Sequence, residues 1–156
     1  MGNFNYECAA AHSKIKNGKK YLSLVDILKQ RKLTKKHIFL KTDTEGAEWD
    51  TLKHFPVEDL QYIDQIAFEF HLGAIYPEQW GQLDILRTLM KYFVNINYHM
   101  NNYSCTKDRK LPSTAIEATL VNRKLIKLKS QTRSYALHPL NMINNPDPAV
   151  TDCQVI

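Results

Sequence analysis

The sequence predicts an α/β fold, in which flanking helices accompany a partial and mostly parallel β-sheet. Short apolar runs at 37–43, 65–72 and 92–99 have the length and the β-branched or aromatic content of strands. Helical periodicity between these runs indicates right-handed crossovers, which join parallel strands. A fourth run at 113–122 follows a polar connection without helical periodicity, so we expect this last strand to return antiparallel.

The first expected helix covers about 23–32 and precedes the first strand. Ser23 and Asp26 have the spacing of a capping box, which marks a helix N-terminus. Leu24, Ile27 and Leu28 then form one apolar stripe, as in a helix that packs on a core.

An acidic turn follows the first strand. Asp43 and Glu45 stand where the strand should end, Gly46 permits a sharp turn, and helical spacing resumes at Ala47 until before Pro56. Open α/β sheets bind ligands at such strand–helix corners. The alternative is that these acids only favour the start of the helix electrostatically.

The later elements complete the expected sheet. In the second strand, Ala67, Glu69 and His71 share one face; the next helix opens near Tyr76, and its expected buried residues are Trp80, Leu83, Leu86 and Met90. In the third strand, Asn95, Asn97 and His99 form one polar face, which we expect to be partly exposed, as on a sheet edge.

Two ion pairs are expected between the first two strands. In the expected register, Lys41 meets Glu69 inside the covered sheet, beneath a pair of Asp43 and His71 at the rim. Pairing is expected because a lysine or glutamate is costly to bury alone.

Four segments resemble the FkbM-type methyltransferases and their methyltransferase-like eukaryotic relatives. They are LKTDTEGAEWDTL, which carries a lysine, an aspartate and a Glu-Gly pair at the family's spacing, and IAFEFHLG, YHMNNYSC and STAIEATLVNRK. The resemblance runs from about Tyr21 to Lys124 and implies strands four to seven of a Rossmann-like class I methyltransferase sheet, with the last strand inserted antiparallel between the two before it. Nothing resembles the family's first half, and the five glycines form no G-x-G-x-x-G loop.

On this basis, the chain divides into three parts. Residues 1–20 are a poorly defined N-terminal segment, 21–124 are the C-terminal half of a methyltransferase-like domain, and 125–156 are an irregular tail. The resemblance implies S-adenosylmethionine as the cofactor, bound mainly by the first three strands, which have no counterpart here.

The candidate site lies at the carboxyl ends of the parallel strands. The candidate catalytic residues are Asp43, Glu45 and His71, and the candidate substrate-binding residues are Glu69, Asn101 and Asn102. Methyl transfer to a hydroxyl needs a base, and His71 or a carboxylate of the corner is suited to that role. His71 also has a purely structural interpretation. Asp43, Glu45 and His71 alternatively suit a divalent cation, but three residues from two loops do not establish one, and no metal is predicted.

Two functions remain open. The first is methyl transfer from S-adenosylmethionine to a small-molecule or sugar hydroxyl in the complete protein, the isolated chain being inactive. The second is a non-catalytic remnant or binding module that kept the sheet and lost the cofactor site. In either case, Phe39 and its neighbours are expected to leave an exposed sheet edge through which the chain can self-associate.

Composition excludes several other classes. The chain has 156 residues, enough for one domain, and its net charge of +5 comes partly from basic runs at Lys14–Lys20, Lys29–Lys36 and Arg123–Lys129. These runs match no nucleic-acid motif, so they are interpreted as solvated faces and no nucleic-acid partner is expected. No apolar run has the length of a membrane span and no secretory signal is present, which gives a cytoplasmic location by default. The three cysteines have no metal or redox spacing.

Overall fold

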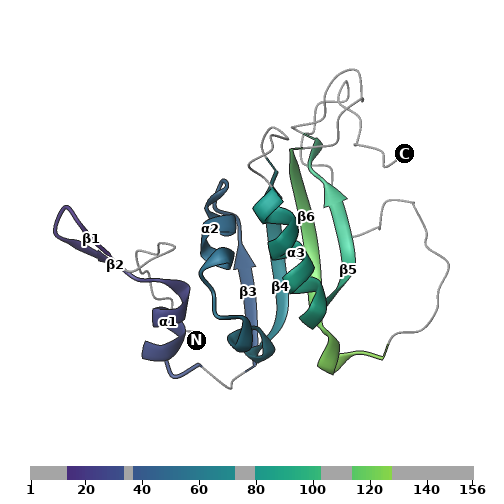
Figure 1. The fold of residues 1–156 in the computed structure, drawn as a ribbon, viewed down its shortest axis with the longest axis horizontal. Helices are drawn as coiled ribbons and strands as arrows, with labels where there is room; N and C mark the ends of the chain where they lie inside the picture. Colours follow the sequence, from purple (N-terminus) through teal and green to yellow (C-terminus); the bar gives the residue numbers. More distant parts are fainter. Residues whose placement is uncertain (1–13, 34–36, 73–79, 103–113, 128–156) are drawn as a thin grey trace, which may run out of the picture.

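The computed structural model describes residues 14–33, 37–72, 80–102 and 114–127 (Figure 1). The predicted irregular tail lies almost wholly outside these ranges, as do residues 1–13. The strands are β1 (Lys14–Lys16), β2 (Lys19–Tyr21), β3 (Ile38–Thr42), β4 (Ile63–His71), β5 (Phe93–Met100) and β6 (Ala115–Asn122). The helices are α1 (Leu24–Gln30), α2 (Ala47–Lys53) and α3 (Trp80–Tyr92), with short 3-10 helices η1 (Val57–Tyr62) and η4 (Arg123–Leu125).

The main sheet has the strand order β3-β4-β6-β5. β3 and β4 are parallel, whereas β6 is antiparallel to both β4 and β5, between which it lies. The predicted mixed sheet, with its last strand inserted antiparallel, is therefore confirmed. The chain is a mixed α/β structure in which β3 occupies one edge of the described sheet.

The helices α2 and α3 lie over one face of this sheet (Figure 1). Between them and the strands is a core that includes Trp49, Phe68, Phe70, Leu89, Phe93 and Leu120. The ring of Phe70 lies 5.1 Å from that of Trp49 and 4.9 Å from that of Phe68, measured between centroids. Each such buried side chain contributes about 1.5–3 kcal/mol, so this packing fixes α2, and hence the corner before it, against β4.

Helix α1 begins as the capping box predicts. The Asp26 amide donates to Ser23 Oγ at 3.2 Å, and Ser23 Oγ in turn donates to the Asp26 carboxylate at 2.8 Å. These contacts satisfy groups that an uncapped first turn would leave to water.

The buried face of α3 agrees with the expected one at Leu86 and Met90 but differs elsewhere, while the expected opening near Tyr76 and the side chain of Trp80 lie outside the described residues. Leu83 is 45% exposed, whereas Leu89, which was not predicted, is 1% exposed. The described α3 residues in or against the core are Ile85, Leu86, Leu89, Met90 and Tyr92, so Ile85 and Leu89 take the place expected of Leu83. Contact with β5 and η1 selects these residues, and a single helix pattern does not contain that information.

The predicted edge position of β5 is confirmed, and of its polar face Asn95 is exposed and Asn97 half-buried, but a bulge changes the environment of His99. The pairing with β6 shifts between Asn95 and Asn97, so that Ile96 has no partner in the register. Beyond this bulge His99 is buried, while Ile96 and Tyr98 are exposed. An extra residue in a strand moves each side chain that follows it to the opposite face of the sheet.

The expected ion pair between Lys41 and Glu69 is also wrong. The register places Lys41 beside Ala67, and the Lys41 side chain is exposed. Its face of β3, which includes Phe39 at 61% exposure, is open to solvent instead of being covered by helices. Lys41 therefore has no burial cost that a carboxylate would have to offset.

Part of the poorly defined N-terminal segment forms a regular β-hairpin. β1 and β2 pair antiparallel around Asn17 and Gly18, whose φ angles are 52° and 73°. Two consecutive left-handed residues with this sequence are typical of a two-residue hairpin turn. None of the helices in the described ranges is long and apolar enough to span a membrane.

Candidate functional site

The parallel pair β3 and β4 brings the predicted acidic corner and the end of the second strand to one edge of the sheet. Asp43 follows β3, while Glu69 and His71 end β4. One possible ligand atom from each of these three residues lies within 4.8 Å of the other two. The structure therefore brings together three of the predicted site residues from separate segments.

The backbone of the corner adopts left-handed conformations at two successive residues. The φ angle is 52° at Glu45 and 98° at Gly46. Glycine accepts this conformation freely, whereas at a residue with a Cβ it costs about 1–2 kcal/mol. Strain of this kind is common at functional sites, and here it projects Glu45, which is 87% exposed, toward His71.

The carboxylate of Glu48 holds the corner together, and the sequence analysis did not identify it. Its side chain has no exposed surface, and it accepts hydrogen bonds from Thr44 Oγ1 at 3.0 Å and from the Gly46 amide at 2.9 Å. The other carboxylate oxygen accepts from the backbone amide of His71 at 2.8 Å. Burial alone would raise the pKa of Glu48, but the hydrogen bonds from His71 and the corner outweigh it and lower the pKa.

Glu48 also fixes the orientation of the His71 imidazole. The Nδ1 atom of His71 lies 3.1 Å from Glu48 Oε1. A buried, ionised carboxylate can only accept, so this contact places a proton on Nδ1. In the neutral ring, Nε2 then carries a free lone pair, and it lies 3.4 Å from Glu45 Oε2 and 3.9 Å from Glu69 Oε1.

The predicted pair of Asp43 and His71 at the rim is not the closest contact of His71. The closest acidic partners of His71 are Glu48, Glu45 and Glu69, and Asp43 belongs to the same group at a longer range. One imidazole therefore faces four carboxylates.

The asparagines predicted to bind substrate have separate environments. Asn101 Nδ2 donates to Glu69 Oε1 at 2.9 Å, which positions Glu69 at the edge. Asn102 is 1% exposed, so its side chain lies within the protein rather than at the solvent-facing edge. Both roles remain predictions.

Two further residues extend the acidic cluster along the sheet. Glu117 of β6 stands directly opposite Glu69, an arrangement that repels when both are ionised. The Nδ1 atom of the buried His99 lies 3.3 Å from Glu117 Oε2. The bulge in β5 brings His99 to this face, and no single-strand pattern would have revealed it.

The cluster has the ligand types that a divalent cation takes. The sequence suggested Asp43, Glu45 and His71 as an alternative cation site, whereas the structure groups Asp43 and His71 with Glu69. Two carboxylates and one imidazole suit several divalent ions, and the contact of Glu48 with Nδ1 would leave Nε2 as the ligand atom.

No family model, no curated protein and no solved structure matches this chain. The resemblance to FkbM-type methyltransferases therefore rests on the short motifs alone. Any function has to be argued from the geometry of the edge.

Proposed function

We propose that the chain forms the acceptor side of a class I, S-adenosylmethionine-dependent methyltransferase-like domain. In the complete protein, this domain would methylate a hydroxyl group of a small molecule or sugar. The strand order β3-β4-β6-β5 supports the proposal, because it is the order that the resemblance implies for strands four to seven. The position of the polar residues at the carboxyl edge of the parallel strands also supports it.

The Glu48–His71 pair is the observation that carries this proposal. A general base needs a free lone pair, a fixed orientation and a group that stabilises its protonated form. Nε2 offers the lone pair, and the buried Glu48 carboxylate on Nδ1 supplies the other two requirements, as the carboxylate does in a serine-hydrolase triad.

This geometry supports one proton movement. His71 Nε2 would accept the proton of an acceptor hydroxyl, so that the hydroxyl oxygen could bond to a methyl carbon whose bond to the sulfonium sulfur breaks at the same time and leaves a neutral thioether. The resulting imidazolium is stabilised by Glu48 on one side and by Glu45 and Glu69 on the other. Asp43 and Glu69, which group with His71, would orient the other hydroxyl groups of a polyol acceptor.

S-adenosylmethionine would supply the methyl group as a sulfonium, and the described residues fit only part of it. The carboxylates of the edge suit a positively charged sulfonium. The cavity on the α1 side of the corner, lined by Thr42, Glu48 and residues of α1, has about 230 Å³, which is smaller than the pockets of about 300–1,000 Å³ that hold small-molecule ligands. A cavity of about 610 Å³ lies between α2, η1 and α3, but none of the edge carboxylates lines it. We therefore expect weak binding of the cofactor by this chain alone.

A second candidate, a binding module without catalysis, is favoured by the open edge of β3. Phe39 is 61% exposed there, and among the described residues no strand pairs with β3 on that side. A sheet that lost its donor-binding half would have such an edge. A binding module would not need a lone pair on His71 Nε2, whereas a methyltransferase that uses His71 as its base would. The protonation of His71 therefore distinguishes the two candidates.

The protonation of His71 tests the proposed role directly. Nitrogen-detected NMR of the ¹⁵N-histidine-labelled chain distinguishes the two neutral tautomers. We expect the Nδ1–H form at His71 and a shift toward a mixture in Glu48→Gln. A His71 ring that carries its proton on Nε2 would exclude it as the base.

A titration with S-adenosylmethionine tests the cofactor. We expect no micromolar binding by calorimetry, and millimolar cofactor should perturb backbone amides of the corner at 42–48 but not those of the hairpin at 14–21. Micromolar binding would show that the chain has its own donor site. Perturbations that are absent from the corner would contradict the proposed acceptor edge.

A further inference from the structure

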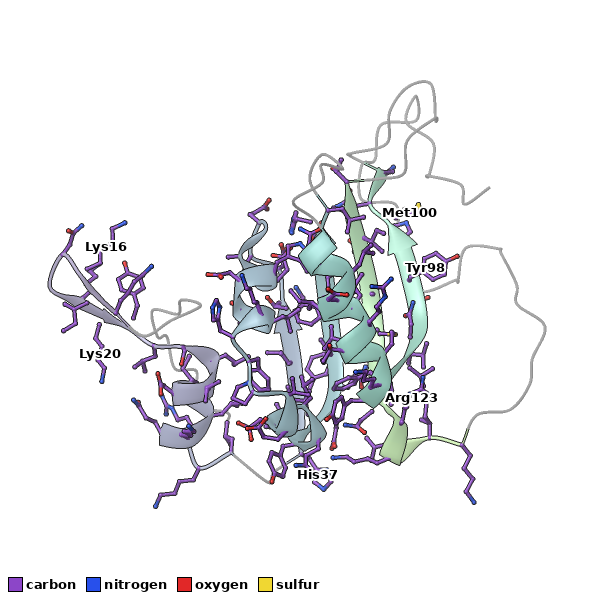
Figure 2. The ribbon with its side chains drawn as sticks, viewed as in Figure 1. Lys16, Lys20, His37, Tyr98, Met100 and Arg123 are labelled. Atoms are coloured by element: carbon purple, nitrogen blue, oxygen red, sulfur yellow. The ribbon has the colours of Figure 1, made fainter. Side chains whose placement is uncertain are left out.

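The hairpin β1–β2 carries a concentrated positive charge that the proposed function does not use. Lys14, Lys16, Lys19 and Lys20 lie within seven residues, and all four side chains are exposed. No acidic residue lies between them in the sequence. Figure 2 shows Lys16 and Lys20 on a hairpin that stands apart from the main sheet.

The register of the hairpin sets like charges against each other. Lys16 pairs directly with Lys19, and Lys14 and Tyr21 are the next pair on the same face. Like charges in such positions destabilise a pair of strands, and an isolated two-stranded hairpin is only marginally stable. Among the residues that the structure describes, none of the four lysines forms an ion pair with an acid. The arrangement thus costs stability unless an anionic partner neutralises it.

An exposed apolar side chain sits among these lysines. Ile15 is 77% exposed, and it shares the second face of the hairpin with Lys20, its cross-strand partner. A phosphate backbone gains little from contact with isoleucine. A lipid surface gains from it, because the side chain leaves water for the interfacial region while neighbouring lysines reach the headgroups with long flexible side chains.

We propose that the β1–β2 hairpin docks on an anionic lipid surface. Ile15 enters the headgroup region, and the four lysines approach the acidic headgroups. The hairpin is thin enough for lysines of both faces to lie within a screening length of about 10 Å from the surface. This interaction would hold the domain at a membrane without a spanning helix, and it does not depend on the proposed methyl transfer.

Sedimentation of the full 156-residue chain with lipid vesicles tests the proposal. We expect binding to phosphatidylcholine vesicles that contain phosphatidylserine and little binding to phosphatidylcholine alone. Each lysine near an anionic surface is worth about a fivefold change in affinity, so Lys16→Gln with Lys19→Gln should weaken binding about 25-fold. Raising the salt concentration should weaken it as well.

The matched control makes the same charge change elsewhere. Lys53 of α2 and Lys91 of α3 are exposed, and Lys53→Gln with Lys91→Gln should change binding by less than about twofold if the hairpin is the contact. If the two double variants lost vesicle affinity equally, the net charge of the chain would explain the binding, and the proposal would be overturned. Circular dichroism of each variant checks that it remains folded.

Ile15→Ser separates a lipid surface from a nucleic acid. We expect this variant to lose roughly fivefold in vesicle binding. Binding to duplex DNA, measured at the same salt concentration, should be weak in the parent chain and unaffected by the substitution. Unchanged vesicle binding in Ile15→Ser, or DNA binding tighter than vesicle binding, would contradict lipid docking.

Discussion

The amino and carboxyl ends of the parallel strands β3 and β4 differ in their ratio of acidic to basic side chains. At the amino end, the single carboxylate of Asp64 meets two basic groups, Lys124 at 3.0 Å and His37. At the carboxyl end, four carboxylates face the one imidazole of His71. Among the residues that the structure describes, the charges are balanced at the amino end and predominantly negative at the carboxyl end.

The pKa of the central carboxylate is lowered at both ends, by different means. At Asp64, hydrogen bonds from Lys124 and His37 lower the pKa. At Glu48, hydrogen bonds from His71 and the corner overcome the opposing effect of burial. Asp43 and Glu45 are exposed, and neither carboxylate accepts a hydrogen bond from the residues that the structure describes. We interpret the amino end as serving stability and the carboxyl end as keeping surplus charge, in line with the proposed site.

The largest expected effect is the loss of the buried carboxylate at the carboxyl end. Glu48→Ala leaves the amides of Gly46 and His71 and the hydroxyl of Thr44 without their acceptor. Breaking such a buried charged network costs about 3–5 kcal/mol. Urea denaturation measures this change. The control, Glu45→Ala, removes an exposed carboxylate from the same corner and should cost less than about 0.5 kcal/mol.

Acid should destabilise the fold through both ends. Because the folded pKa values of Glu48 and Asp64 are lowered, each contributes stability that is present above its unfolded pKa and is lost as the pH falls through the folded pKa. Unfolding free energies measured from neutral pH down into the acid range should decrease. The decrease should be smaller in Glu48→Gln and in Asp64→Asn, and a parent curve without any acid loss would refute this linkage.

A moderate loss of folding stability is expected when Gly46 of the corner is replaced by alanine. The φ angle of Gly46 is 98°, and a Cβ added there would meet nothing within 4 Å. Gly46→Ala should therefore cost about 1 kcal/mol through backbone strain alone. Thermal unfolding measures it. A cost of several kcal/mol would mean that the corner rearranges, and the orientation of Glu48 would then have to be determined again.

At the amino end of the parallel strands, Lys124→Ala should lower the free energy of unfolding by a smaller amount. Lys124 Nζ donates to the Gln61 carbonyl at 2.6 Å and contacts Asp64, but its side chain is 45% exposed. Partly exposed pairs contribute about 0.2–1 kcal/mol. Urea denaturation at low and high salt should show a loss in this range that shrinks with salt, unlike the loss in Glu48→Ala.

The sequence predicted the elements that depend on local pattern. Ser23 and Asp26 predicted the start of α1. The apolar runs predicted the strands β3, β4, β5 and β6, and the connection before β6 predicted that this strand is antiparallel. These features follow from residues close together in the chain, or from the small number of allowed strand connections.

Features that depend on distant partners could not be predicted in this way. The role of Glu48 requires the His71 amide, 23 residues away, and an acid in the first turn of a helix is otherwise ordinary. The bulge at Ile96 is defined only by the pairing of β5 with β6. The predicted burial of Lys41 failed because it assumed a covered second face, and that face is open at Phe39.

The central interpretation is that the carboxyl end keeps surplus charge at the expense of stability. The most direct test compares Asp43→Asn with Asp64→Asn by urea denaturation at about pH 8, where carboxylates are ionised. Removing one of four neighbouring carboxylates should leave stability unchanged or raise it by up to about 0.5 kcal/mol, because functional residues are often not optimal for stability. Removing Asp64 from its two basic partners should lower stability by about 1 kcal/mol. If Asp43→Asn were destabilising to the same extent as Asp64→Asn, the acidic edge would be a structural network, and the interpretation of its charge as surplus would be wrong.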